Sequence, residues 1–255
     1  MKATEIQARR DQILTLLESR KTMRVSELVN ILKISDETVR KDLSQLSTQG
    51  LVKKEFGKVS LLVAPTLAPV HQRTTVNASF KAAIANEALE LLPDRPSTIA
   101  LDQGSSVAQL ANLIANRTRD TIITNSLLAM IALQNSHQQI YVTGGKYNVT
   151  DMSFQGERPS RMYTDSLFDF CFLGSSGVAG RNGLCSSSFA DAEMKRQMIK
   201  NSHVSIVLLD ATKFQQSSLV QVADWNQVDY VVTNLSPTNP LYVEINQQTH
   251  LVSVM

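Results

Sequence analysis

Residues that commonly build metal centres and disulfide frameworks are scarce in this chain. It contains 2 cysteines and 4 histidines among 255 residues. Cys171 and Cys185 lack the spacing of a zinc site or of a disulfide framework, and the histidines share no ligand spacing. We therefore expect no metal and no histidine-based catalysis. A free, buried Cys171 suits the reducing cytoplasm.

Long apolar segments and nucleotide-binding glycine motifs are also absent. No run of about 18 uncharged apolar residues occurs, which argues against a membrane-spanning helix. The N-terminal residues MKATEIQARRDQ lack the apolar core of a signal peptide. Neither GxGxxG nor GxxxxGK[ST] is present, so nothing supports a nucleotide cofactor. We expect a cytoplasmic protein that uses no cofactor and does not associate with a membrane.

The charged residues are unevenly distributed along the chain. Residues 1–60 carry 12 Lys/Arg and 8 Asp/Glu, whereas the remaining 195 residues carry 13 and 15. A basic N-terminal part on a nearly neutral body has the sign expected of a DNA-binding module joined to a larger domain. The total length allows a small domain followed by a medium-sized one.

The N-terminal part has the apolar spacing of short helices. Ser35 is placed to cap a helix in which Val39, Leu43 and Leu46 occupy the buried side. The segment LVKKEFGKVSLLV follows, and its two β-prone arms around a glycine are typical of a hairpin. Three helices and a hairpin predict a winged helix-turn-helix DNA-binding domain over residues 1–62.

The side chains expected to meet DNA lie on the capped helix, away from its apolar stripe, and on the hairpin. Helix residues are expected at base edges and hairpin lysines at phosphates. These residues are Ser35, Glu37, Thr38, Arg40, Lys41, Ser44, Gln45, Lys53, Lys54 and Lys58.

Acidic residues in the stretch ISDETVRKDL are unexpected beside DNA phosphates. Asp36 and Glu37 fall in the first helical turn, where negative charge favours the positive end of the helix dipole. Glu37 either accepts a hydrogen bond from a cytosine amino group or only stabilises the helix. Asp42 is expected on the flank of the helix, paired within the N-terminal domain.

Residues 63–77 hold two prolines and no periodicity, and are predicted to be a linker. From residue 78 onward, short apolar strands alternate with amphipathic helices. Strands are expected at 98–102, 121–124, 139–143, 168–174, 204–210 and 230–233. This alternation predicts an α/β domain over residues 78–255, with a mostly parallel sheet flanked by helices.

Five of the predicted strands end in small or polar residues, and ligands of open α/β sheets lie at the carboxyl ends of the strands. Gly104, Ser105 and Ser106 stand between a strand and a helix, where backbone N–H groups and the helix dipole favour a phosphate. Lys213 can add a cation to the same anion. Taken alone, such a Gly-Ser turn is more often only a turn. Glu193 is equally consistent with a solvated side chain.

Six motifs in the C-terminal part and one in the N-terminal part carry a resemblance to a known family. They are VSELVNILKISDETVRKDLSQLSTQGLVKK, LDQGSS, ITNSL, VTGGKYN, FDFCFLGSSGVAGRNGL, ADAEMKRQMI and LLDATKF. In this order they resemble the DeoR-type (GlpR-type) bacterial transcriptional regulators over nearly the whole chain. One departure is the hairpin EFGKVS, which has a single glycine where family members commonly carry a Gly-Gly pair.

The resemblance implies a C-terminal fold similar to sugar-phosphate isomerases and a sugar phosphate as effector. It also implies a repressor of a sugar or polyol catabolic operon that the effector releases from operator DNA. The implied effector-binding residues are Asp102, Gly104, Ser105, Ser106, Thr124, Asn125, Ser126, Gly144, Gly145, Gly174, Glu193, Lys195 and Lys213.

Two other functional classes remain to be weighed. An isomerase needs a carboxylate base near the reacting carbon, and the turn LGSSG after the strand FDFCFLG has no carboxylate. Glu193 alone, without an acid partner, favours a sensor over an enzyme. A scaffold with neither ligand nor DNA has no use for the polar strand ends. Because one helix-turn-helix reads only a few base pairs, we expect a homo-oligomer, at least a dimer.

Overall fold

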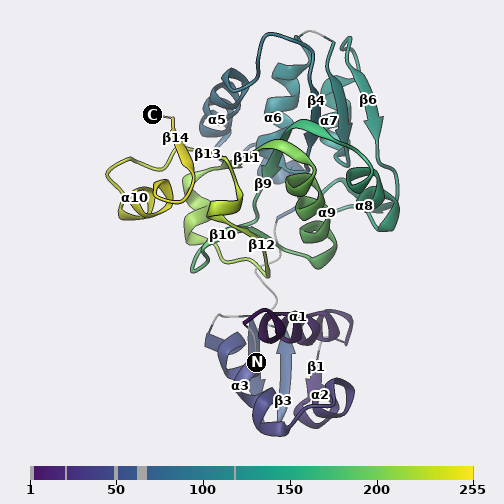
Figure 1. The fold of residues 1–255 in the computed structure, drawn as a ribbon, viewed down its shortest axis with the longest axis vertical. Helices are drawn as coiled ribbons and strands as arrows, with labels where there is room; N and C mark the ends of the chain where they lie inside the picture. Colours follow the sequence, from purple (N-terminus) through teal and green to yellow (C-terminus); the bar gives the residue numbers. More distant parts are fainter. Residues whose placement is uncertain (1–2, 21, 49–50, 62–67, 118, 255) are drawn as a thin grey trace. The chain divides into compact units, whose positions relative to one another are not determined.

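The N-terminal part of the chain folds as a helix-turn-helix followed by a β-hairpin. The computed structural model describes residues 3–20, 22–48, 51–61, 68–117 and 119–254. The chain divides into two units, Met1–Thr66 and Leu67–Met255 (Figure 1). The first unit contains α1 (Ala3–Arg20), β1 (Thr22–Arg24), α2 (Val25–Leu32), α3 (Asp36–Thr48), β2 (Val52–Glu55) and β3 (Lys58–Leu61). Its strands form an antiparallel sheet in the order β1-β3-β2.

Helix α3 is oriented by the apolar stripe that the sequence predicts. Val39, Leu43 and Leu46 are each at most 1% exposed. The helix begins after Ser35, whose Oγ accepts a hydrogen bond from the backbone N–H of Thr38 at 3.2 Å. This bond satisfies one of the free N–H groups of the first turn. The opposite side of α3 is consequently turned to solvent.

The segment predicted to be a linker is folded over much of its described length. Residues 62–67, which include the predicted domain boundary, lie outside the described residues. Beyond them comes α4 (Val70–Arg73). Val70 is fully buried and donates its N–H to the carbonyl of Thr150 at 2.8 Å. Residues 68–77 therefore belong to the second unit.

A seven-stranded parallel sheet forms the centre of the second unit, in the order β14-β13-β11-β9-β4-β5-β6. The strands are β4 (Thr98–Leu101), β5 (Thr121–Thr124), β6 (Gln139–Val142), β9 (Phe168–Gly174), β11 (Ser202–Leu209), β13 (Tyr230–Thr233) and β14 (His250–Ser253). The first six correspond to the predicted strands, and β14 was not predicted. The α/β fold class with a mostly parallel sheet is confirmed.

Helices lie on both faces of this sheet (Figure 1). One face is covered by α5 (Ala78–Glu90), α6 (Ser105–Ile114) and α7 (Leu127–Leu133), and the other by α9 (Phe189–Lys200) with α8 (Glu157–Thr164) beside it. The unit also contains α10 (Pro240–Asn246) and two short 3-10 helices, η1 (Ala211–Gln215) and η2 (Trp225–Gln227). Two antiparallel pairs complete it: β7 (Lys146–Asn148) with β8 (Ser153–Gln155), and β10 (Gly183–Ser186) with β12 (Val220–Asp224). Among the described helices, none is long and apolar enough to cross a membrane.

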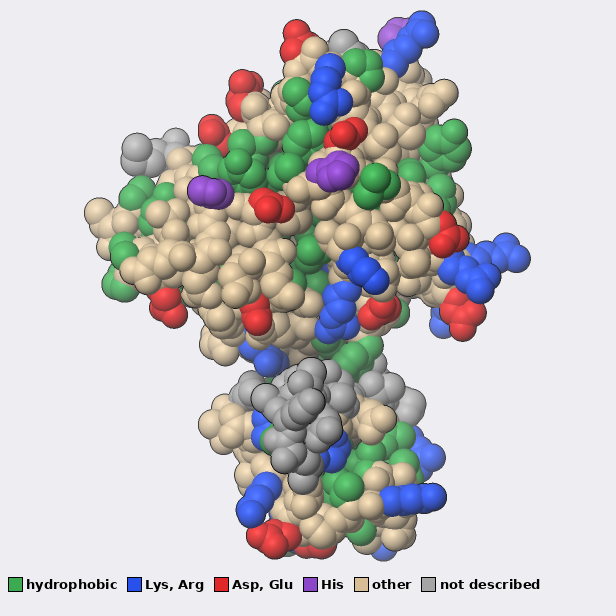
Figure 2. All heavy atoms as spheres, viewed as in Figure 1, with side chains coloured by type: hydrophobic (Ala, Val, Ile, Leu, Met, Phe, Trp, Pro, Cys, Tyr) green, Lys and Arg blue, Asp and Glu red, His purple; other side chains and the backbone are tan. Residues whose placement is uncertain are grey.

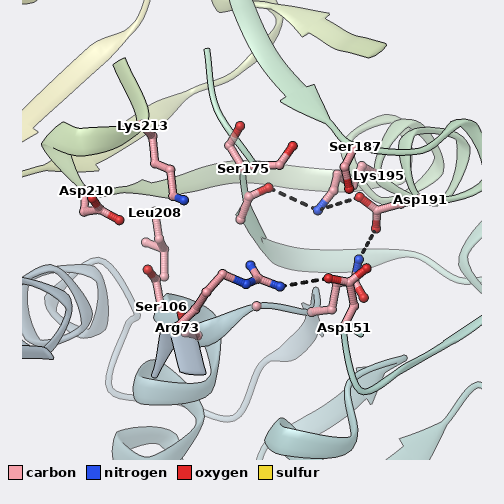
Figure 3. Close-up of a pocket in the computed structure, with 15 residues that line it drawn as sticks. Arg73, Ser106, Asp151, Ser175, Ser187, Asp191, Lys195, Leu208, Asp210 and Lys213 are labelled. Atoms are coloured by element: carbon pink, nitrogen blue, oxygen red, sulfur yellow. Dashed lines mark hydrogen bonds and ion pairs between the residues drawn. The ribbon is translucent and has the colours of Figure 1, made fainter. Parts of the chain in front are cut away.

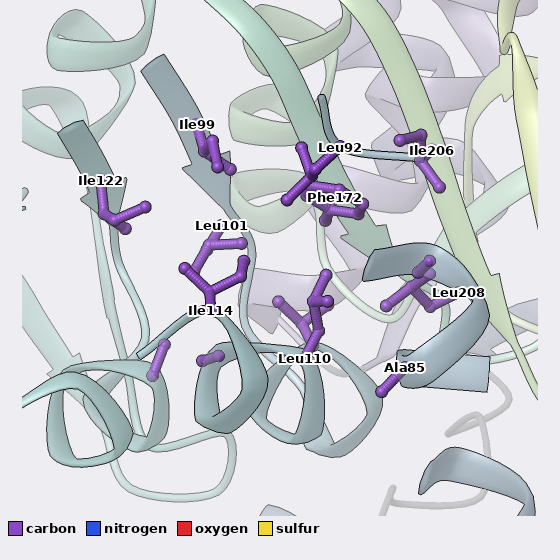
Figure 4. Close-up of a cluster of buried hydrophobic side chains, with 14 of the residues drawn as sticks. Ala85, Leu92, Ile99, Leu101, Leu110, Ile114, Ile122, Phe172, Ile206 and Leu208 are labelled. Carbon is purple, nitrogen blue, oxygen red and sulfur yellow. The ribbon is translucent and has the colours of Figure 1, made fainter. Parts of the chain in front are cut away.

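A cluster of buried apolar side chains lies between the sheet and the helices α5 to α7 (Figure 4). Leu110 of α6 packs with Leu101, Phe172 and Leu208 from three neighbouring strands, and each is at most 2% exposed. Burying a side chain of this size contributes about 1.5–3 kcal/mol. The predicted burial of Cys171 on β9 is also observed, and burial raises the pKa of its thiol to about 12.

The register of the strands places three polar strand ends side by side. Leu101 of β4 pairs with Phe172 of β9, and Leu208 of β11 pairs with Gly174 of β9. The residues that follow β4, β9 and β11 therefore emerge at one edge of the sheet. Neighbouring strands are about 4.8 Å apart, so a small molecule can contact the loops after all three.

Candidate functional site

A pocket opens at the carboxyl ends of β4, β9 and β11 (Figure 3). Its cavity volume is about 40 Å³, and the surrounding space, which includes open solvent, brings the total to about 520 Å³. Its walls come from the loops after these strands, from α9, from α4 and from the turn between β7 and β8. The pocket is polar and carries charges of both signs.

One end of the pocket is the beginning of α6. Gly104 precedes the helix at a φ of 120°, a conformation that favours glycine, and no side chain caps the helix. Gly104, Ser105 and Ser106 all line the pocket. Uncapped N–H groups at the positive end of a helix favour an anion.

Three cations gather near this end. Arg73 and Lys213 line the pocket, and Lys81 on α5 is 3% exposed. Burial lowers the pKa of all three side chains. The charge of Arg73 lowers the pKa of Lys81 and Lys213 further, while Asp210 partly offsets this for both lysines. Because these cations repel one another, an entering anion would be stabilised by all three.

The other end of the pocket holds a buried ion-pair network around Lys195. Its Nζ forms a short ion pair with Asp102, lies 3.4 Å from Asp191, and donates to the carbonyl of Gly174 at 3.1 Å. Asp102 also accepts the N–H of Gly174 at 2.9 Å. Burial raises the pKa of Asp102 to about 6, although Lys195 acts in the opposite direction. Burial would lower the pKa of Lys195, but the two aspartates raise it overall.

Gln103 leaves one polar atom without a partner in this pocket. The side chain is 7% exposed, and its Nε2 donates to Asp191 at 2.8 Å, which fixes the orientation of the amide. Its Oε1 has no hydrogen-bond partner within the described part of the chain. A buried acceptor without a partner is unfavourable by about 1–3 kcal/mol, so a ligand hydroxyl placed there would be stabilised.

The structure brings about half of the predicted effector residues to the pocket. Gly104, Ser105, Ser106, Gly174, Lys195 and Lys213 line it. Asp102 lies beneath, 1% exposed and bonded to Lys195.

Residues after β5 do not reach the pocket and support its wall instead. Thr124 donates to the carbonyl of Leu101 at 2.8 Å, and Ser126 caps α7. The carbonyl of Asn125 accepts the N–H of Phe154 on β8 at 2.8 Å. These residues therefore hold the β7–β8 pair, because β5 is separated from the pocket by β4.

The glycines after β6 are further away still. Gly144 and Gly145 are not among the residues that line the pocket. Gly145 has a φ of 107°, and an added Cβ would lie 2.7 Å from Cγ of Pro159 and 2.8 Å from the carbonyl of Gln155. Its position requires glycine for packing, which is sufficient to explain the residue.

Of the two acids on α9, the one that lines the pocket is Asp191 and not the predicted Glu193. Asp191 and Lys195 are four residues apart and share the buried face of the helix. Glu193 lies on the exposed side and pairs with Arg196 at 3.6 Å. Helical periodicity applied to ADAEMKRQMI would have separated the two acids.

Arg73, Asp151 and Asp210 also line the pocket and were not predicted. Arg73 and Asp151 are 78 positions apart in the chain, so no local pattern connects them. Asp151 and Asp191 mean that the pocket has carboxylates, contrary to the expectation of a single one. The count of carboxylates therefore does not distinguish a sensor from an isomerase.

In the first unit, seven of the ten predicted DNA-contacting residues line two grooves that have Arg40 and Ser44 in common. Glu37, Arg40, Lys41, Ser44 and Gln45 line a shallow groove along α3. A second groove runs between α3 and the hairpin and includes Arg40, Ser44, Lys54 and Lys58. Ser35 and Thr38 stand at the start of α3, and Lys53 lies on β2. Figure 2 shows Lys and Arg side chains exposed on this unit.

The acids of ISDETVRKDL are all paired. Asp36 pairs with Arg40, and Glu37 with Lys41 at 2.9 Å, both on the exposed face. Asp42 is different, because it is 2% exposed and accepts hydrogen bonds from Arg9 and Arg10 at 2.6 and 3.0 Å. It joins α3 to α1, in line with the expected pairing within this domain.

A helix-turn-helix unit joined to an α/β unit with an anion-favouring pocket is the architecture of a ligand-responsive transcriptional regulator. Two family models match the chain: the DeoR-like helix-turn-helix domain over residues 9–62 and the DeoR C terminal sensor domain over residues 76–235. The chain belongs to the DeoR family of transcriptional regulators.

Curated relatives agree with this assignment along nearly the whole chain. The regulator GolR of Listeria innocua is 30% identical over 236 residues, covering 92% of both chains. The glycerol-3-phosphate regulon repressor of Escherichia coli is 27% identical and covers 93% of both. The L-fucose operon activator of Haemophilus influenzae is 31% identical, covering 83% of this chain and 85% of its own. These relatives are regulators and not enzymes.

Among solved structures, the chain is similar to a ribose 5-phosphate isomerase A from Methanocaldococcus jannaschii. The TM-score is 0.40 at 20% identity, and the match covers 54% of each chain.

Proposed function

We propose that this regulator represses a sugar or polyol catabolic operon and that a phosphorylated sugar releases it from operator DNA. The observation that carries the proposal is the cluster of Arg73, Lys81 and Lys213 at the uncapped start of α6. Burial lowers the pKa of all three side chains, and the charge of Arg73 lowers the pKa of both lysines further, as expected of a site that awaits a dianion. Carboxylates and an unpartnered amide oxygen at the other end suit the hydroxyls of a sugar.

The two ends of the pocket take different parts of such an effector. The phosphate binds the N–H groups of residues 104–106 and the ammonium of Lys213. The hydroxyls bind Asp191, Asp151 and Gln103. Lys195 lies 3.4 Å from Asp191 and holds it in place, and Asp102 fixes Lys195 in turn.

The DNA contacts belong to the exposed face of α3 and to the hairpin, which acts as a wing. Arg40, Ser44 and Gln45 face base edges, and Lys54 and Lys58 contact phosphates. The protein acts in the cytoplasm as a homo-oligomer, at least a dimer, because one such unit reads too few base pairs to select an operator.

The names of the relatives support a carbohydrate effector and leave the sign of control open. One relative is a repressor of a glycerol-3-phosphate regulon and another an activator of an L-fucose operon. Repression is the simpler mechanism for this chain, since bound protein blocks the promoter and effector binding removes it. For a hundredfold release the effector must favour the DNA-free state by about 3 kcal/mol.

A thermal-shift screen of sugar and polyol phosphates, followed by DNA binding to the promoter beside the gene, tests the proposal. At 100 times its dissociation constant a ligand stabilises the protein by about 2.7 kcal/mol. The hit should lower DNA affinity, and Lys213→Ala should abolish the shift. Lys200→Ala, an exposed lysine on α9, serves as the control. If phosphorylated and unphosphorylated sugars act equally, or none weakens DNA binding, the proposal fails.

A further inference from the structure

The guanidinium of Arg73 connects the first described residue of the second unit to the wall of the pocket. Its Nε donates to the carbonyl of Ala68 at 2.8 Å, and its Nη2 donates to Oδ1 of Asp151 at 2.8 Å. Both partners of the ion pair are largely buried, with side chains 16% and 14% exposed. One side chain therefore links α4, residue 68 and the turn between β7 and β8.

Residues 68–77, named here the strap, are fastened to the pocket at further points. Lys81 of α5 donates to the carbonyl of Val76 at 2.7 Å and to the carbonyl of Arg73. Asn77 donates to Asp210 at 3.4 Å. The strap is continuous in the chain with residues 62–67, which lead from the helix-turn-helix unit. The side chain of Arg73 alone therefore joins Asp151 in the pocket to Ala68 at the start of the strap.

The ion pair of Arg73 with Asp151 crosses from the anion end of the pocket to the hydroxyl end. Figure 3 shows Arg73 with its backbone near Ser106 and its guanidinium directed toward Asp151, which lies on the side of Asp191. Nη1 of Arg73 has no hydrogen-bond partner within the described ranges. An anion can therefore approach the guanidinium before the ion pair breaks.

We propose that the effector takes the place of this ion pair and so releases the strap. Its phosphate binds the guanidinium of Arg73 together with Lys213, because a dianion attracts the cation more strongly than a single carboxylate does. A sugar hydroxyl then donates to Asp151, which would otherwise repel the phosphate. As the guanidinium turns to the phosphate it leaves the carbonyl of Ala68. The strap loosens, and binding of the operator weakens. This inference rests on the proposed function.

Two substitutions with opposite expected effects test the exchange, with inorganic phosphate as the probe and the full-length chain as the protein. Arg73→Gln should weaken phosphate binding roughly tenfold or more, because it removes a charged partner. Asp151→Asn should strengthen phosphate binding severalfold, because it removes the competitor for the guanidinium. If Asp151 only held the fold of the pocket, Asp151→Asn would instead weaken phosphate binding. Arg95→Gln and Asp94→Asn, at exposed positions outside the pocket, are the matched controls.

Hydrogen–deuterium exchange measures the strap directly. The N–H groups of Val70, Arg73 and Thr74 are hydrogen-bonded in this state. Phosphate should speed their exchange while protecting residues 104–107, and Asp151→Asn should speed strap exchange without ligand. Arg73→Lys, which keeps the charge but not the forked geometry, should retain part of the phosphate affinity and also show fast strap exchange.

The outcomes separate this inference from the function on which it rests. If phosphate protects residues 104–107 but leaves strap exchange unchanged, or if Asp151→Asn weakens binding, the exchange mechanism is wrong and the anion site stands. If phosphate changes the exchange of neither segment and Lys213→Ala does not alter phosphate binding, the proposed effector site itself is refuted.

Discussion

Replacing Lys195 with methionine isolates the energetics of the buried network beneath the pocket. Methionine keeps most of the side-chain volume and removes the charge. Lys195 and Asp102 are 3% and 2% exposed at their side chains, so solvent screens their attraction very little. Removing one partner of a buried ion pair destabilises a protein by about 3–5 kcal/mol, because the other charge is left uncompensated. We expect a loss of that size for Lys195→Met at pH 8.

The loss should depend on pH with a defined sign. Burial already raises the pKa of Asp102 from 3.8 to about 6, and Lys195 opposes this rise. Without Lys195 the folded-state pKa rises further above that of the unfolded chain. The folded variant then binds an extra proton between the two pKa values, so its stability falls as pH rises through that window. The variant should regain about 1.4 kcal/mol per pH unit on acidification across it.

Urea unfolding followed by tryptophan fluorescence suits this measurement. Trp225 is the only tryptophan in the sequence and is 1% exposed in the second unit, so its signal reports that unit alone. The double variant Lys195→Met/Asp102→Asn removes both charges and should recover stability at pH 8 without the pH dependence. A loss below about 1 kcal/mol at pH 8 would contradict the uncompensated-charge account. An equal loss at pH 5 and pH 8 would contradict it too.

Four further outcomes are expected. Lys58→Ala should weaken binding to specific and random DNA alike and reduce the salt slope by about 1, as gel shifts at several salt concentrations would show. Glu37→Gln should change the preferred base at one operator position in a binding-site selection; an unchanged preference with a lower melting temperature would assign Glu37 to helix stability alone. Asp191→Asn should abolish the thermal shift from the effector, whereas Glu193→Gln should leave it intact; equal losses would place Glu193 in the site. Phosphate binding requires the protonated form of Lys213, and burial lowers the pKa of this side chain from its usual value of 10.5. Phosphate affinity should therefore decline at a pH below 10.5. Calorimetry at rising pH measures this, and a decline that begins only near 10.5 would contradict the prediction.

The local rules of helices and strands were enough to predict much of this fold from the sequence. Ser35 caps α3, and the spacing of Val39, Leu43 and Leu46 determines which face is buried, because a helix repeats every 3.6 residues. Apolar runs such as FDFCFLG predict strands buried on both faces. The start of α6 at residues 104–106 was also predictable from a local pattern, because glycine and serine after a buried strand favour a turn into a helix.

Short, half-exposed elements escaped prediction because their stability comes from neighbours distant in sequence. The strand β14 pairs with β13 at the edge of the sheet, and α4 is held by contacts to the β7–β8 turn and to Lys81 of α5. Neither has a strong pattern of its own. Residues 68–77 were predicted to be part of a linker for the same reason: prolines and a lack of periodicity do not reveal that contacts with distant residues bury Val70.

The sequence by itself determined the family, the α/β class, the polar strand ends and the cation Lys213. Only the tertiary structure decided which of those ends share a pocket. Strand order places β4 beside β9 and β9 beside β11, and leaves the loops after β5 and β6 outside. Arg73 and Asp151 are 78 positions apart in the chain, and they meet because α4 packs against the turn between β7 and β8. Charged side chains form ion pairs when the packing of separate elements brings them within a few ångströms, and their spacing along the sequence does not predict that distance.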